Sequence, residues 1–358
     1  MGLDILVCID DVPNELLTQM VSSVEVYEKI DQNTSFKLTF MVDVCDKDIA
    51  KGLMREITPG KMLSILASVK DELACLVKGP IIQQDINIQH GGAGSYIHVV
   101  GEDIAHNMDH VTRFQPNDSV TDAEIVSAIL TSKNNNMIAD VEATPHSTHN
   151  EENHINVQKD SDLAVIRSLA HRNGFHFWIT WSTAGLATGH FRPRIMDGKA
   201  SADLIVNHDN FNMDSFRTNL NASPPNKTVG MQLNLRTKEI FGGTFTLDDN
   251  KLGKDGLASL TDEEGQSIHL APMVDDIGPL RARSEAALRE AQWFIKASCR
   301  TSLHRLCKIV SKHCIVNVQG AGSLHSGQYY VTGVKHLIDA ASYIMELELE
   351  RNAWGNEE

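Results

Sequence analysis

The sequence has none of the segments that insert a protein into a membrane or send it across one. No stretch approaches the roughly 18 consecutive apolar residues that a membrane span requires. The first ten residues include acidic side chains and lack the basic start of a secretory signal. We therefore expect the chain to be made and folded in a cytoplasm, without membrane insertion of its own.

The cysteines include no Cys-x-x-Cys pair, which disfavours a zinc ribbon or a dithiol redox centre. The six positions are Cys8, Cys45, Cys75, Cys299, Cys307 and Cys314. In a cytosolic chain, cysteines spread this widely are typical of free, mostly buried thiols.

Positive charge is scarce relative to negative charge. The chain has 32 Lys and Arg side chains against 47 Asp and Glu side chains, for a formal net charge of -15. Tight binding to nucleic acid depends on basic side chains that neutralise phosphates, so this balance disfavours specific nucleic-acid binding. It does not oppose the passage of DNA or an acidic cargo along an acidic or neutral wall.

The motifs of common hydrolases and nucleotide-binding enzymes are also missing. The glycine-rich segments 91–94 and 320–322 are not followed by Lys-Ser/Thr and fit hairpin turns better than phosphate loops. Ser326 lies in His-Ser-Gly, without the Gly-x-Ser-x-Gly elbow. Possible bases that lack an ordered set of partners in the sequence are His98, His106 and His110. We predict a protein that is not an enzyme, while a triad assembled only in space stays open.

Two clusters contain the residue types that bind metals, but neither has the spacing of a zinc frame. The first is His146, His149, Glu151, Glu152 and His154, in a polar stretch that is typical of a solvated loop. The second is Cys299, His304, Cys307, His313 and Cys314, where a predicted helix runs into a strand and the side chains would point in different directions. We predict no required metal, no cofactor and no catalytic residue.

Short strands separated by turn residues dominate the first hundred residues. The clearest alternation places Phe36, Leu38, Phe40 and Val42 on one face. The predicted strands are residues 3–9, 21–26, 36–42, 62–68, 72–78, 85–90 and 96–101, with turns at residues 10–13 and at 79–80. This pattern predicts a barrel or sandwich.

Helical periodicity appears after residue 101. We predict helices over residues 103–109, 121–131 and 160–173, followed by a strand over 175–181. Asp122 is a candidate cap of the second helix, and Asp160 or Ser161 of the third. Gly174 is expected to end the third helix.

The last part returns to strands. We predict strands over residues 204–207, 213–220, 228–234, 243–246, 307–319, 329–337 and 342–351. A polar loop is predicted over 249–278 and one helix over 279–298. The predicted fold class is mainly β with an α+β insert: a first barrel-like domain (1–100), an α+β middle domain (101–200) and a second barrel-like domain with a long loop and one helix (201–358).

Two longer segments and one short one resemble a known family. Residues 160–181 resemble the segment in late control protein D, and in the hub part of type VI secretion VgrG spike proteins, where an Asp-capped helix ends at a Gly before an aromatic strand. The matching positions are Asp162, Leu163, Ile166, Leu169, Ala170, Gly174, Phe175 and Phe177. Residues 320–336, followed by Arg351 and Asn352, resemble the closing hairpin of that family, and residues 99–103 resemble its Gly-x-Asp step.

The resemblance implies a structural hub protein in the baseplate of a contractile tail, assembled in the bacterial cytoplasm and located in a virion or injection particle. It implies a homotrimeric ring with pseudo-sixfold symmetry between a hexameric tail tube and a central spike. The implied partners are a tail tube or tube-initiator protein, a separate spike protein and baseplate wedge proteins.

Other functions stay open at this point. One is a cell-wall-degrading hydrolase of the same machine, and another is a β-rich carbohydrate-binding module. The particle could be a phage, a tailocin or an injection system. If a channel exists, we expect acidic side chains to outnumber basic ones on its wall, and the candidates are Asp43, Asp46, Asp48, Asp248 and Asp249. The acidic surplus could instead keep the outer surface soluble.

Overall fold

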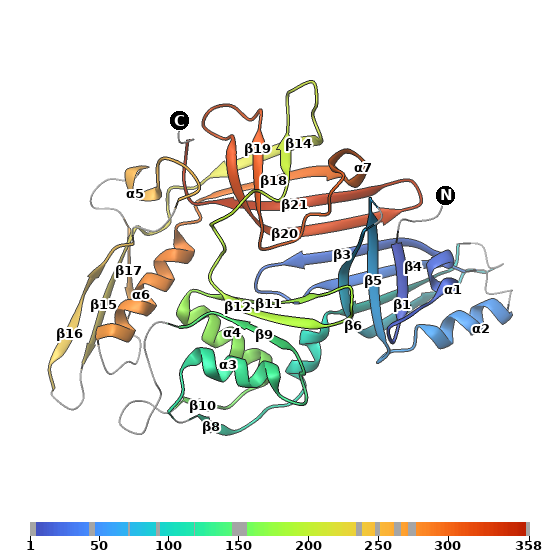
Figure 1. Ribbon diagram of the computed structural model, residues 1–358, viewed down its shortest axis with the longest axis horizontal. Coiled ribbons are helices and arrows are strands. Elements are labelled where there is room, and N and C mark those ends of the chain that lie inside the picture. Colours follow the sequence, from blue (N-terminus) through green and yellow to red (C-terminus); the bar gives the residue numbers. More distant parts are fainter. Residues whose placement is uncertain are drawn as a thin grey trace.

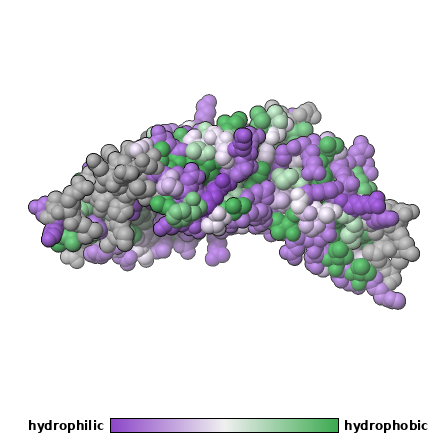
Figure 2. All heavy atoms as spheres, turned by 90° about the horizontal axis from the view of Figure 1, so that it is seen from below, coloured by the Kyte–Doolittle hydropathy of each residue, from purple (hydrophilic) through white to green (hydrophobic). Residues whose placement is uncertain are grey.

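Two β units lie side by side, with an α+β unit beneath them and a smaller lobe at one flank (Figure 1). The structure, a computed structural model, describes residues 5–42, 47–70, 72–90, 94–117, 119–144, 156–233, 238–247, 251–260, 266–270 and 277–355. Among these residues, no helix is long and apolar enough to span a membrane. The surface seen from below Figure 1 is largely hydrophilic, and its hydrophobic residues form several separate groups (Figure 2).

The first β unit contains the predicted alternating strands. In β4, Phe36, Leu38 and Phe40 are all buried and share one face, as predicted. Its elements are β1 (Ile5–Ile9), β2 (Val12–Pro13), α1 (Glu15–Met20), β3 (Val21–Lys29), β4 (Ser35–Met41), α2 (Lys47–Glu56), β5 (Met62–Val69), β6 (Glu72–Asn87) and β7 (Tyr96–Glu102). The predicted turn after β1 is confirmed, because Asp10 and Asp11 both have positive φ and Ile9 pairs with Val12.

The prediction of a turn at Gly79 and Pro80 is wrong. Strand β6 continues through both residues, pairing with β5 up to Pro80 and with β7 from Ile81 onward. A Cβ atom on Gly79 would lie 1.8 Å from the Glu102 carbonyl oxygen, so only glycine allows the two strands to approach this closely. The Gly-Pro pair therefore marks the place where one strand passes between two sheets.

The middle unit packs helices against a three-stranded sheet. Its elements are η1 (Ile104–Asp109), β8 (Gln115–Asn117), α3 (Asp122–Thr131), β9 (Ile138–Val141), β10 (Asn156–Gln158), α4 (Asp162–Asn173), β11 (His176–Trp181) and β12 (Ala187–Arg192). Ser161 caps α4, and Gly174 ends it with φ 66, both as predicted. The buried side of α4 shares one core with Phe177 and Ile179 of β11.

The cap of α3 differs from the prediction. Thr121, and not Asp122, is the N-cap, and it forms a capping box with Glu124. Asp122 is buried instead and bonds to Arg172 and Asn173 of α4. Its carboxylate therefore fixes the contact between two helices.

The second β unit holds the last strands of the chain, and the side lobe is inserted between two of them. The β unit comprises β13 (Asp203–Ile205), β14 (Met213–Leu220), β18 (Ile295–Ser302), α7 (Leu303–Leu306), β19 (Ile315–Gln319), β20 (Gly327–Asp339) and β21 (Tyr343–Arg351). The lobe comprises β15 (Lys227–Leu233), β16 (Ile240–Phe245), α5 (Leu257–Leu260), β17 (Ser267–Leu270) and α6 (Ile277–Ala291).

Three predictions in this part need correction. The helix predicted to Ser298 ends at Ala291, and β18 follows, with Ile295, Ala297 and Cys299 buried in strand alternation. Residues 307–314 precede β19 instead of belonging to it. The predicted loop 249–278 contains α5 and β17. In the first case, an alanine-rich helix is followed closely by a strand that also contains small residues. The amino-acid composition therefore does not reveal the change from helical to strand periodicity.

One sheet passes through both β units. Strand β20 of the second unit pairs with β3 of the first, with Lys29 opposite Gly333. The resulting path, β14-β18-β21-β20-β3-β4-β7-β6, is called the joint sheet here, and every neighbouring pair along it is antiparallel. The apolar residues beneath it form a single core cluster drawn from both units. The two units are therefore held together by main-chain hydrogen bonds as well as by apolar packing.

A buried ionic cluster fixes the middle unit and the lobe to this sheet. Arg194, just after β12, donates to Glu290 of α6 at 2.9 Å and to Glu350 of β21 at 2.7 Å. His176 of β11 lies 3.1 Å from Glu290 and 2.9 Å from Asp31. Burial alone would lower the pKa of His176, but its hydrogen bonds to Asp31 and Glu290 outweigh burial and raise the pKa to about 9. Burial opposes the charge on Glu290, yet His176 and Arg194 bring its pKa down to about 2.

A second buried polar chain lies where β3 meets β20. His336 lies 3.1 Å from a Glu28 carboxylate oxygen through Nε2 and 3.0 Å from the Tyr343 hydroxyl through Nδ1. Lys312 reaches the same junction, with its main-chain N–H directed at Glu28 and its ammonium 3.2 Å from the Thr34 hydroxyl. These groups satisfy one another inside the protein, which favours one register between the two β units.

Candidate functional site

The outer face of the joint sheet is mostly polar. On β21, Glu346, Glu348 and Glu350 point outward, while the residues between them are buried. Strand β18 alternates in the same way. Because successive side chains of a strand point to opposite faces, the sheet buries its apolar side in the core and presents a charged side to solvent.

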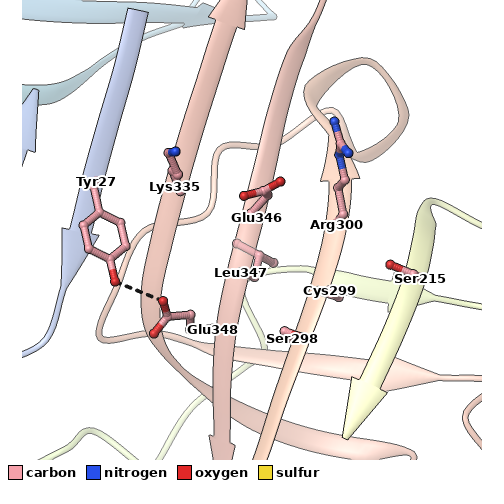
Figure 3. A pocket seen from close by; sticks show the side chains of 9 residues that line it. All are labelled: Tyr27, Ser215, Ser298, Cys299, Arg300, Lys335, Glu346, Leu347 and Glu348. Atoms are coloured by element: carbon pink, nitrogen blue, oxygen red, sulfur yellow. Dashed lines mark hydrogen bonds between the residues drawn. The ribbon is translucent and has the colours of Figure 1, made fainter. Parts of the chain in front are cut away.

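Two shallow hollows occupy this face. The larger has a volume of about 660 Å³ and is lined by side chains from β3, β20, β21, β18 and β14. Figure 3 shows these residues, with Lys335, Glu346 and Arg300 in one row across three neighbouring strands. The adjoining hollow, of about 500 Å³, continues along the same strands and shares Ser298 and Glu348 with the first.

Ion pairs run across the strands of this face. Lys29 lies 2.9 Å from Glu348, which also accepts a hydrogen bond from the Tyr27 hydroxyl at 3.0 Å. Lys335 lies 3.1 Å from Glu25. The hydrogen bond to Glu348 raises the pKa of Lys29, so that side chain stays charged. Each pair is partly exposed and stabilises the fold by roughly 0–1 kcal/mol.

The face is close to neutral as a whole. By cross-strand register, seven acidic side chains and six basic side chains face outward on it, although the chain carries a net charge of -15. The acidic ones are Glu25, Asp85, Glu102, Asp339, Glu346, Glu348 and Glu350. The basic ones are Lys29, Lys37, Arg217, Lys296, Arg300 and Lys335. The acidic surplus of the chain therefore lies elsewhere.

Comparison with known proteins identifies the family from the sequence. Residues 4–184, just over half of the chain, match the family described as the Alg8 N-terminal domain. The chain belongs to the Alg8 N-terminal domain family. No curated protein matches the chain.

Solved structures share the fold of this member of the Alg8 N-terminal domain family. The 43 kDa tail protein of prophage MuSo2 from Shewanella oneidensis is 13% identical, with a TM-score of 0.69 over 98% of both chains. A tail protein from Neisseria meningitidis is 10% identical, with a TM-score of 0.66 over 99% of this chain and 98% of the other. The E. coli c3393 protein, a component of the type VI secretion system, is 11% identical, with a TM-score of 0.58 over 98% of this chain and 79% of the other.

At sequence identities this low, the structural likeness establishes a shared fold alone. The predicted mainly β fold with an α+β insert is confirmed as that of these tail proteins. The finer assignment to late control protein D stays a prediction.

The first predicted metal cluster falls outside the described residues: His146, His149, Glu151, Glu152 and His154 all lie within 145–155. Four of the five acidic candidates for a channel wall, Asp43, Asp46, Asp248 and Asp249, also fall outside the described residues. The fifth, Asp48, lies in α2. Asp48 is therefore not part of the joint sheet.

The second predicted cluster is spread over separate environments. Cys299 is buried in β18, where burial raises its pKa to about 12. Cys307 is exposed after α7. His313 is buried and stacks on Trp178 with 3.7 Å between ring centroids, and Cys314 contacts Ser201. Within the described residues, no group of three His, Cys, Asp or Glu side chains is placed to hold a metal.

The other candidates have structural contacts. Ser326 accepts a hydrogen bond from the Ala321 N–H and so closes the turn before β20. His98 faces outward on β7 and contacts the Thr39 hydroxyl at 3.0 Å. His106 packs edge-on against His110. At Gly320 a Cβ would lie 1.7 Å from the Val206 carbonyl oxygen, so this glycine serves close packing of two turns.

Sequence reasoning missed both the joint sheet and the buried ionic cluster. Lys29 and Gly333, which pair in the sheet, lie about three hundred residues apart in the sequence. The sequence contains one local signal of the cluster, because His176 stands between Phe175 and Phe177. A polar side chain in such an apolar run is expected to have a buried hydrogen-bond partner.

Proposed function

We propose that this protein is a structural, non-enzymatic hub subunit in the baseplate of a contractile tail. Three copies form a ring that joins the tail tube to the central spike, and the outer face of the joint sheet lines the channel of the ring. The observation that carries the proposal is the joint sheet itself: one antiparallel sheet through two β units, apolar beneath and polar and hollowed above.

The joint sheet suits a ring because it fixes two β units at one relative orientation. Three copies would place six β units around an axis, which matches a hexameric tube of the kind that the family resemblance implies. Main-chain pairing between β3 and β20 keeps the units from moving independently. The solved tail proteins share this fold along nearly their whole length, which supports the assignment.

The charge of the proposed wall suits passage more than binding. Its acidic and basic side chains nearly cancel, and several are already paired across strands. Such a wall neither attracts a polyanion strongly nor repels it strongly. We therefore propose a nearly neutral wall instead of the strongly acidic one expected from net charge.

The proposed partners are the tail tube or tube-initiator protein at one end, a separate spike protein at the other and wedge proteins outside. A chain of a Francisella PdpA–VgrG complex shares the fold with a TM-score of 0.55, over 59% of that chain, which supports a setting next to a spike. We propose domains 1–100, 101–200 and 201–358, no catalytic residue and no required metal. The particle baseplate, in a virion or an injection machine, is the proposed location.

The mass of the assembly tests the trimer. Light scattering of the purified protein, alone and with its spike partner, should give about 118 kDa for the hub component, which is three copies of 39.5 kDa. A complex with three hub copies per spike trimer supports the proposal. One hub copy per spike trimer, or a monomer in both samples, would contradict it.

A further inference from the structure

Trp178 of β11 lies between two histidine rings where the middle unit meets the second β unit. On one face it stacks on His190 of the neighbouring strand β12, with 4.9 Å between ring centroids. On the other face it stacks on His313, from the segment before β19, with 3.7 Å between centroids and 14° between the planes. His313 is held in place there, because its main-chain N–H donates to the Val331 carbonyl of β20. The stack of His313 on Trp178 therefore joins the two units directly.

His313 makes this contact at a cost. Its φ of 64 lies in the left-handed region, which is uncommon for residues other than glycine. Its Nδ1 lies 2.9 Å from the Tyr330 hydroxyl, but its buried Nε2 has no hydrogen-bond partner among the described residues. Both features raise the free energy of the docked arrangement, so a further cost at His313 favours separation of the two units.

The side chains that face His313 are mostly basic. Lys312 precedes it in the chain, and the His176 ring of β11 lies 5.8 Å from its own ring. Arg194 and His190 approach from the middle unit. Burial first, and then these four neighbours, keep the pKa of His313 well below its usual value. His313 is therefore neutral in the docked arrangement.

No free counter-ion remains for a second proton on His313. Four carboxylates of the junction already contact other basic side chains: Glu28, Asp31, Glu290 and Glu350. Burial raises the pKa of the Tyr330 hydroxyl, so this neighbour stays neutral and supplies no negative charge. A proton added to His313 would thus create a buried positive charge without compensation against the face of Trp178.

We propose that His313 is an acid-sensitive latch between the middle unit and the second β unit. When its imidazole takes up a proton from solvent, the ring leaves Trp178 and is hydrated instead. The β11–β12 hairpin then separates from the segment before β19, and Trp178 becomes exposed. The latch does not depend on the proposed ring, because all of its parts lie within one chain.

The latch should respond to pH below 6.5. Once the units have separated, the imidazole has its ordinary pKa of about 6.5, so docking is unaffected above that pH and weakens about tenfold for each pH unit below it. The ionic cluster does not titrate in the same range. The pKa of Glu290 is about 2, and against the effect of burial His176 keeps the pKa of Asp31 below its usual value. Between pH 6.5 and 4.5 the docking equilibrium should therefore shift by about 100-fold through His313.

Fluorine NMR of the full-length protein labelled with 5-fluorotryptophan measures the exposure of Trp178, which is 8% exposed in the docked arrangement. Its signal is the one that is missing from Trp178→Phe. The neutral spin probe TEMPOL broadens the signals of exposed rings. On going from pH 7.5 to 4.5, the broadening of the Trp178 signal by TEMPOL should increase several-fold, and it should reverse when the pH is restored.

Substitutions on the two faces of Trp178 separate the latch from general acid effects. His313→Asn cannot titrate and suits the left-handed backbone, so the broadening of Trp178 should be the same at both pH values. His190→Gln is the matched control and should keep the acid response. No response in the wild-type protein, the same response in His313→Asn, or its loss in His190→Gln would overturn the latch.

A second variant keeps the test decisive if His313→Asn does not fold. Tyr330→Phe removes the hydrogen-bond partner of the neutral His313 ring, so separation should begin at a higher pH than in the wild-type protein. An unchanged midpoint in Tyr330→Phe would also overturn the latch.

Discussion

At the scale of single residues, buried charge determines where the middle unit sits. His176 and Arg194 come from the strand hairpin of the middle unit, and their carboxylate partners come from the other units. His176 and Arg194 are the buried members, so removing a carboxylate partner leaves a buried positive charge with less compensation, which costs more than the pair contributes. The cluster therefore acts as a fixed point between parts of the chain that are far apart in sequence.

We predict that His176 makes the stability of the protein depend on pH. Its pKa is about 9 in the folded chain and about 6.5 when unfolded, so its contribution is complete below pH 6.5 and is lost as pH rises through 9. The free energy of unfolding should fall by about 3 kcal/mol across this range. In His176→Gln, urea unfolding from pH 6 to 10 should show a flatter profile.

His106→Gln is the matched control, since the His106 side chain is 29% exposed against 3% for His176. In this control the free energy of unfolding should depend on pH as it does in the wild-type protein. Equal slopes in His176→Gln and wild type would show that the cluster does not hold a protonated imidazole.

At the scale of elements, α4 and β11 form the core of the middle unit. Leu163, Ile166 and Leu169 are at most 3% exposed and lie in one cluster with Phe177. The change Leu169→Asp would bury an unpaired carboxylate, and we expect it to destabilise the protein by several kcal/mol. His171→Asp, at an exposed position of the same helix, should change stability by less than about 1 kcal/mol. If thermal melting showed the two variants to be alike, the orientation of α4 would be wrong.

Elements with a clean local period could be predicted from the sequence, and long-range pairings could not. The strand around Phe36 and the helix ending at Gly174 each carry their own signal, in period and in cap. Gly79 was misread because glycine serves a turn and a close strand crossing equally well, and only the position of Glu102 distinguishes them. Ile295 begins a strand directly after a helix, without a glycine or proline between the two.

The candidate site was harder to predict than the fold. Outward charges such as Glu348 and Lys335 read as an ordinary solvated strand face in the sequence. Their role depends on β3 pairing with β20, which brings together segments from opposite ends of the chain. A single sequence contains no local signal for that pairing.

At the scale of the whole molecule, the joint sheet turns two β units into one rigid plate with a polar surface. The middle unit and the lobe are joined to the sheet through the buried cluster, in which Glu350 at the edge of the outer face binds Arg194, and they meet each other where Gly174 lies next to Ala286. In the ring that we propose, the polar face of each subunit borders the channel and the rest of its surface is available to partners.

The most direct test of the account is a cryo-electron microscopy map of the assembled particle at the level of this protein. We predict three copies around the axis, with Glu348, Lys335 and Arg217 facing an open channel. A map with the joint sheet turned outward, or with a single copy beside the axis, would contradict the account.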